Sequence, residues 1–155
     1  MEYEQLKLEN QLCFPFYAVS RLITRAYQDD LDDLGITYPQ YLVLLVLWER
    51  DGATVNEIAE KLILNTNTVT PLLKRMEAMG LITRTQSLTD QRKVVVKLTS
   101  EGELLKVKAA DIPFKLVRKM NIDLNETSIE ELNRLKMKLN ELILVLKNIE
   151  TSEKA

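Results

Sequence analysis

The amino-acid sequence predicts a mainly α-helical protein with a small β-hairpin wing, a winged helix-turn-helix that dimerises through its N- and C-terminal helices. Three observations predict this fold. Two short amphipathic helices with a tight turn between them are expected within residues 54–79. A pair of β-branched segments follows at once, within residues 81–98. A leucine stripe with heptad spacing lies near the C-terminus and needs a partner surface.

The first helix is expected from Cys13 to Leu34, because Gly35 is a natural helix stop. Pro15 suits the first turn of such a helix, where its missing N–H costs little. The next helix is expected to start after Thr37, with Gln40 completing a capping box. It is apolar on all sides across residues 42–48, which predicts that it forms the buried centre of the domain.

A second capping box, Thr54 to Glu57, opens the first helix of the helix-turn-helix, which is expected to end near residue 62 or 63. After a turn at residues 64–65, the second helix is expected to end at Met79, before Gly80. Strands are then expected at residues 81–85 and 93–98, joined by the polar loop 86–92. This hairpin is the predicted wing.

The C-terminal part is expected to be helical. Ser100 and Glu103 can form a capping box for a helix that Pro113 interrupts, and Ser128 with Glu131 can cap the last helix. We expect a DNA-binding domain at residues 37–102 and a dimerisation region made of residues 1–36 with 103–155. The last helix carries the heptad stripe, which we expect to lie at the dimer interface: Leu132, Leu135, Leu139, Leu142, Leu146 and Ile149.

Composition excludes several classes of protein. The chain has one cysteine and no histidine, which rules out an intramolecular disulfide, a Cys/His zinc site and a Ser–His or Cys–His catalytic pair. We therefore expect no enzyme activity, no metal and no cofactor. The acidic, polar start of the chain does not fit a signal peptide, and the longest apolar run, residues 41–48, is too short to span a membrane. These features predict a cytoplasmic protein.

The net charge of −2 argues weakly against nucleic-acid binding, but basic residues are concentrated locally. Between Thr66 and Lys97 there are six basic and two acidic residues, although a solvated face of mixed charge can look the same. Asp90 precedes Arg92 by two residues at the wing tip and can hold its guanidinium toward the minor groove or a phosphate. The alternative is an exposed ion pair worth under about 1 kcal/mol. The candidate DNA-binding residues are Thr66, Asn67, Thr68, Thr70, Lys74, Arg75, Arg84, Asp90, Arg92 and Lys93.

Cys13 is the candidate redox residue. Its expected place at a helix N-terminus favours a thiolate, and neighbouring aromatic residues (Phe14, Phe16, Tyr17) can supply an apolar pocket. The alternative is a small, buried, unreactive side chain, as most lone cytosolic cysteines are.

Four segments resemble the MarR family of transcriptional regulators and, within it, the organic-hydroperoxide-sensing OhrR branch: QLCFPFY, LGITYPQYLVLLVLWE, TVTPLLKRMEAMGLITR and TDQRKVVVKLTSEG. The resemblance implies a homodimeric winged helix-turn-helix repressor with Cys13 as the sensor. The two tyrosines that hydrogen-bond the sensor thiol across the dimer correspond to Tyr27 and Tyr38, and a third aromatic residue corresponds to Tyr17. The wing Asp-x-Arg of the family corresponds to Asp90 and Arg92.

Three features depart from the family pattern. Residues 65–68 read Asn-Thr-Asn-Thr where Asp-Ser-Gly-Thr is usual, which changes the expected operator sequence. Pro15 is unusual in the family's first helix, and no second cysteine exists. The chain is thus similar to the one-cysteine type of regulator.

The resemblance implies a mechanism in which the reduced dimer binds a pseudo-palindromic operator. An organic hydroperoxide then oxidises Cys13 to a sulfenic acid, which reacts with a small thiol or is oxidised further, and the operator is released. Two alternatives stay open. One is a repressor controlled by a small aromatic ligand, or a broader redox or virulence regulator, with Cys13 structural. The other is a thiol peroxidase that uses Cys13.

Overall fold

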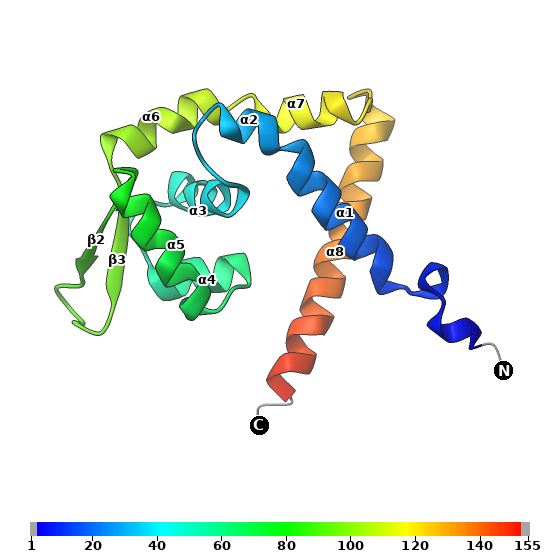
Figure 1. Cartoon of the computed structure of the whole chain (residues 1–155), viewed down its shortest axis with the longest axis horizontal. Helices are drawn as coiled ribbons and strands as arrows, with labels where there is room; N and C mark the ends of the chain where they lie inside the picture. Colours follow the sequence, from blue (N-terminus) through cyan, green and yellow to red (C-terminus); the bar gives the residue numbers. More distant parts are fainter. Residues whose placement is uncertain (1–2, 153–155) are drawn as a thin grey trace. The chain divides into compact units, whose positions relative to one another are not determined.

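The computed structural model of the chain describes residues 3–152 and is mainly helical with a small antiparallel sheet (Figure 1). The chain divides into two compact units, and the boundary between Leu116 and Val117 falls inside α7. The elements in chain order are η1 (Glu4–Leu6), η2 (Leu8–Asn10), α1 (Cys13–Ala26), α2 (Gln28–Asp32), α3 (Tyr38–Glu49), β1 (Ala53–Thr54), α4 (Val55–Leu62), α5 (Thr66–Ala78), β2 (Ile82–Gln86), β3 (Val94–Leu98), α6 (Ser100–Ala109), α7 (Ile112–Lys119) and α8 (Glu126–Ser152).

The predicted first helix is confirmed at its start and divided near its end. α1 begins at Cys13 and holds Pro15 in its first turn, where the ring removes no intrahelical hydrogen bond. The helix is interrupted at Tyr27, although the backbone there stays right-handed (φ −79°, ψ −18°). Gly35 has a left-handed backbone (φ +68°) and ends the segment as predicted.

The central helix α3 starts with the predicted capping box, in which the Gln40 side-chain oxygen accepts the Thr37 N–H at 2.8 Å. The prediction that this helix is buried on all sides is wrong at Leu45, which is exposed. The other residues of the apolar run 42–48 are buried or partly buried.

The helix-turn-helix is confirmed. Thr54 and Glu57 form the capping box of α4, with the Thr54 N–H donating to Glu57 Oε2 at 2.7 Å. The chain leaves α4 through Ile63 in a left-handed conformation (φ +55°) and enters α5 at Thr66. α5 ends within one residue of its predicted end, next to Gly80 (φ +73°).

The wing belongs to a three-stranded antiparallel sheet of order β1-β3-β2. The predicted strands are confirmed to within one residue, and Ile82 pairs with Leu98. β1, in which Ala53 pairs with Val96, was not predicted, because a two-residue strand next to a helix cap has no measurable periodicity.

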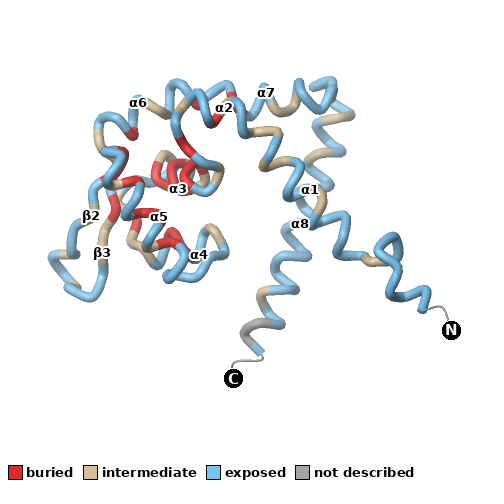
Figure 2. Tube along the Cα trace, in the orientation of Figure 1, coloured by how far each residue is buried: buried red, intermediate tan, exposed pale blue. Residues whose placement is uncertain are grey.

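The buried residues are concentrated in α3, α4, α5 and the sheet strands, whereas α1 and the part of α8 whose side chains the structure describes have none (Figure 2). Each fully buried Leu or Ile side chain contributes roughly 1.5–3 kcal/mol relative to an exposed one. This core therefore fixes the helix-turn-helix against the wing. Its largest fully buried side chains are Leu31, Leu44, Leu47, Ile58, Leu73, Met76, Ile82 and Ile112.

The prediction that Ser100 caps α6 is wrong by one residue. Thr99 is the cap, because its hydroxyl accepts the Gly102 N–H at 3.1 Å and donates to the Gly80 carbonyl at 2.6 Å. The hydroxyl therefore joins α6 to the end of α5. The interruption expected at Pro113 is confirmed, since the break between α6 and α7 lies just before it.

Position 102 requires glycine, because two backbone segments approach each other closely there. A Cβ atom there would lie 2.2 Å from the Leu81 carbonyl oxygen, which is backbone and cannot rotate away. The Gly102 carbonyl also accepts the Trp48 indole N–H at 2.9 Å.

Replacing Gly102 with alanine is expected to lower the free energy of unfolding by about 2–3 kcal/mol, measured by urea denaturation. The matched variant Ser100→Ala, at an exposed position of the same helix, should change it by less than about 0.5 kcal/mol. Equal stability of the two variants would contradict this assignment.

The last helix, α8, is 27 residues long. The prediction that Ser128 caps it is wrong, because Asn125 Oδ1 accepts the Ser128 N–H at 2.9 Å and Ser128 is already helical. Within residues 3–152, none of the helices has the length and apolar character needed to cross a bilayer.

Candidate nucleic-acid interface and redox residues

A groove of about 210 Å³ lies where the start of α4, the start of α5 and the wing meet. Its lining includes three cations and no carboxylate, so it suits a negatively charged ligand. Four lining residues were not predicted as contacts: Thr54, Val55 and Asn56, whose spacing indicated only a helix cap, and Val94, which was predicted only as part of a strand. The other lining residues are Thr66, Thr70, Arg84, Arg92 and Lys93, all of which the sequence predicted as DNA contacts.

The remaining candidates on α5 lie on its exposed surface, outside the groove lining. These are Asn67, Thr68, Lys74 and Arg75. The helix continues without interruption through Pro71, and the Thr70 hydroxyl donates to the Thr66 carbonyl at 2.7 Å near its start. α5 therefore presents a polar N-terminal half and two cations to solvent.

Arg84 has a partner within the chain. Its Nη2 lies 2.7 Å from Glu77 Oε2, its Nε donates to the same oxygen at 3.0 Å, and its backbone N–H donates to Glu77 Oε1 at 3.0 Å. The Arg84 guanidinium holds the pKa of the Glu77 carboxyl below its usual value. This pair joins β2 to α5, and it was not predicted from the sequence.

The wing tip carries the predicted Asp90–Arg92 pair. Asp90 Oδ1 accepts the Arg92 backbone N–H at 3.1 Å and lies 3.4 Å from Arg92 Nε. The Arg92 side chain is 93% exposed, so the pair adds little stability and leaves most of the guanidinium free to bind a ligand.

Cys13 is the first residue of α1 and is exposed. The expected apolar pocket around it is not formed within one chain, because Phe14, Phe16 and Tyr17 are exposed as well. The Tyr17 ring lies 6.4 Å from Phe14, and the Arg21 guanidinium carbon lies 5.8 Å from its centroid. The thiol is thus open to reagents or to a second chain.

Tyr27 and Tyr38 lie side by side, with ring centroids 5.2 Å apart. Tyr41 completes the cluster, 5.9 Å from Tyr27 and 6.4 Å from Tyr38. Burial raises the pKa of all three hydroxyls, that of Tyr41 to about 12. At neutral pH these hydroxyls are therefore protonated and can donate hydrogen bonds.

Cys13 does not reach this tyrosine cluster within one chain. α1 is continuous from Cys13 to Ala26, and at 1.5 Å per residue it separates Cys13 from Tyr27 by about 20 Å. A contact between the thiol and Tyr27 or Tyr38 therefore requires the α1 of a second chain.

The residues of the predicted interface on α8 are mostly exposed. Leu132 is partly buried, whereas Leu139 and Leu142 are each 37% exposed and the others more so. Exposed apolar residues extend beyond the predicted stripe, to Ile143 and Val145.

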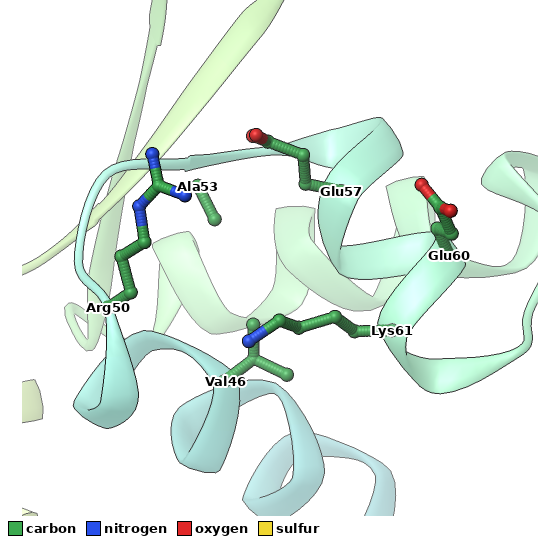
Figure 3. Close-up of a pocket in the computed structure, with 6 residues that line it drawn as sticks. All are labelled: Val46, Arg50, Ala53, Glu57, Glu60 and Lys61. Carbon is green, nitrogen blue, oxygen red and sulfur yellow. The ribbon is translucent and has the colours of Figure 1, made fainter.

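A second cavity, of about 270 Å³, lies beside α3 and α4 (Figure 3). Val46 and Ala53 are its apolar lining residues, and charges of both signs surround them. Two of those charges are engaged, since Lys61 pairs with Glu49 at 2.7 Å and Glu57 forms the α4 cap. The lining holds two cations and two carboxylates, so its charges balance. This cavity therefore does not favour an anion, in contrast to the groove beside the wing.

Comparison with known proteins places the chain. Residues 25–108 match the family model for the transcriptional regulators SarA/Rot. The organic hydroperoxide resistance transcriptional regulator of Bacillus subtilis is 49% identical over 142 residues, covering 92% of this chain and 93% of that protein. The regulator MgrA of Staphylococcus aureus is 38% identical over 133 residues, covering 85% of this chain and 89% of MgrA.

Among solved structures, reduced AbfR bound to DNA superimposes with a TM-score of 0.76 at 36% identity, covering 94% of this chain and 99% of that chain. AbfR is a protein of Staphylococcus epidermidis. The SarA/Rot model matches more than half of this chain, and a hydroperoxide resistance regulator is nearly half identical to it. The chain therefore belongs to the MarR/SarA family of winged-helix transcriptional regulators, on the organic-hydroperoxide branch.

Proposed function

We propose that this protein is a homodimeric DNA-binding repressor that releases its operator when an organic hydroperoxide oxidises Cys13. The observation that carries the proposal is the cationic groove between α5 and the wing, in a chain 49% identical to an organic hydroperoxide resistance regulator. Because the relatives are transcriptional regulators, the alternative of a thiol peroxidase is disfavoured.

The helix-turn-helix and the wing are the proposed DNA-binding surface. The start of α5 presents hydroxyl and amide side chains that suit base edges and phosphates, and its N-terminal N–H groups attract anions. The wing adds Arg92 and Lys93, which suit the sugar-phosphate backbone or the minor groove. AbfR, similar in fold and sequence, has been solved bound to DNA.

Dimerisation is supported by the exposed apolar residues of α1 and α8, which a single chain leaves in water. We propose that residues 1–36 and 103–155 form the dimerisation region and residues 37–102 the DNA-binding domain. Two half-sites about one helical turn apart would then face the two α5 helices.

Redox sensing is supported by the exposure of Cys13 and by the tyrosine cluster. In a dimer, the Cys13 thiol of one chain would accept hydrogen bonds from Tyr27 and Tyr38 of the other. Oxidation to a sulfenic acid, followed by reaction with a small thiol, would add bulk where the two chains pack. AbfR has been solved in reduced, overoxidized and disulfide forms. We place the regulator in the cytoplasm, where small thiols are reduced and DNA is accessible.

The proposal is tested by fluorescence anisotropy with the DNA upstream of the protein's own gene. Affinity is measured before and after one equivalent of an organic hydroperoxide, and again after a thiol reductant. Tight binding that is lost on oxidation and restored by the reductant supports the proposal. Tight binding that ignores the peroxide favours a ligand-controlled repressor, in which Cys13 is structural.

Replacing Arg92 with alanine is expected to weaken operator binding about three- to tenfold and to reduce the salt dependence by about one phosphate contact, because a single exposed cation is lost. The response to peroxide should not change. Anisotropy titrations at several salt concentrations measure both quantities. Lys108→Ala removes a cation from α6, outside the groove, and should leave the salt dependence unchanged. If the two variants behave alike, Arg92 is not a DNA contact.

A further inference from the structure

A buried amide connects the start of α3 to the end of α5. Gln40 is 5% exposed, and its Oε1 accepts the Thr37 N–H at 2.8 Å. Its Nε2 donates to the Met79 sulfur at 3.2 Å. A thioether is a weak acceptor, so this buried amide depends on a weak hydrogen bond.

Met79 lies at the C-cap of α5, where its backbone N–H donates to the Arg75 carbonyl at 3.0 Å. It is also accessible, with 44% of the residue exposed. Met79 is thus a residue exposed to solvent whose sulfur contacts a buried polar group. This combination suits a site whose chemical modification would change the packing at the C-terminal end of α5.

We propose that Met79 is a second oxidation site, chemically separate from Cys13, and that its oxidation to the sulfoxide disturbs the position of α5. The inference rests on the proposed function, because its effect on DNA requires that α5 contacts DNA. The oxidant class is a hypohalous acid. The sulfur gains one oxygen and gives up two electrons, hypochlorous acid is reduced to chloride, and one proton is released.

Oxidation changes the contact with Gln40 in size and in polarity. Nitrogen and sulfur lie 3.2 Å apart, so an oxygen added between them does not fit unless one of the two groups moves. An oxygen added on the other side makes the side chain polar and leaves the sulfur a poorer acceptor for the buried amide. Either product strains the link between α3 and the C-cap of α5. Gln40 lies on α3 between Tyr38 and Tyr41, so the same link joins α5 to the helix that carries two of the three clustered tyrosines.

The chain offers a matched control. Met120 is also 44% exposed, but it lies beyond α7, far along the chain from α5. Exposure predicts that hypochlorous acid reaches both sulfurs. Only oxidation of Met79 is expected to affect α5.

The test uses the full-length Cys13→Ser protein, so that no thiol reacts. This protein and its Met79→Leu and Met120→Leu derivatives are treated with a few equivalents of hypochlorous acid, and mass spectrometry locates the added oxygen. DNA affinity is measured by anisotropy before and after treatment, and amide hydrogen exchange is measured across residues 75–81. Oxidation is expected to weaken DNA binding about tenfold and to speed exchange in this segment in Cys13→Ser and in the Met120→Leu derivative. Neither change is expected in the Met79→Leu derivative.

Loss of affinity and faster exchange that persist in the Met79→Leu derivative would overturn the proposal, as would sulfoxide at Met79 with neither change. If the untreated proteins do not bind DNA, the proposed function fails. The exchange measurement then still decides whether oxidation of Met79 loosens the end of α5.

Discussion

Replacing Cys13 with serine is expected to abolish the response to organic hydroperoxide, while the reduced protein's operator affinity stays within about twofold of wild type. Serine keeps the size of the side chain but cannot form a thiolate or a sulfenic acid. Wild-type protein treated with one equivalent of peroxide should lose about 100-fold in affinity, which corresponds to about 2.7 kcal/mol of coupling between the sensor and the DNA. Anisotropy before and after peroxide measures this difference.

The control for this variant is Ser20→Ala, an exposed position on the same helix that leaves the thiol in place. It should respond to peroxide like the wild type. A Cys13→Ser protein that still releases DNA on treatment with peroxide would rule out Cys13 as the sensor. Because hypochlorous acid also oxidises thiols, the effect of Met79 is measured in the Cys13→Ser background, where the thiol is absent.

Replacing Leu139 with glutamate is expected to dissociate the dimer and to weaken operator binding at least 100-fold. Leu139 lies on the exposed apolar stripe of α8, and a carboxylate buried there without a partner would carry a large desolvation cost. Two half-sites bound by one dimer also gain from effective concentration, which separate chains lose. Sedimentation velocity measures the mass against the 17.9 kDa of one chain, and anisotropy measures the affinity.

The matched variant is Asn140→Glu, which introduces the same charge one residue further along α8, at an exposed position outside the heptad stripe. It should remain a dimer and bind DNA. A Leu139→Glu protein that sediments as a dimer would show that the stripe on α8 does not hold the two chains together.

The groove and the Arg84–Glu77 pair differ in how far the sequence predicted them. Thr66, Thr70, Arg92 and Lys93 were predicted as DNA contacts from a polar helix start and a basic hairpin, and the structure brings them to one groove. Arg84 was predicted in the same way, yet its guanidinium is engaged by Glu77. The sequence showed that Arg84 is charged but not that it is paired, since its partner Glu77 lies on a different element.

Helix caps show the same limit on a smaller scale. The boxes at Thr37 and Thr54 were correct, because both partners lie within four residues of each other. At α6 the sequence pattern also fitted Ser100, and the choice of Thr99 depends on its second hydrogen bond, to Gly80, which is distant in sequence.

The sequence by itself determined the order of the helices, the wing and the presence of a single thiol, because periodicity, caps and composition depend on a few neighbouring residues. Only the tertiary structure decided that β1 joins the wing, that Gln40 meets Met79, and that Cys13 lies about 20 Å along α1 from the tyrosine cluster of its own chain. These relations depend on how separate elements pack against one another, and packing is set by the whole core rather than by any local pattern of residues.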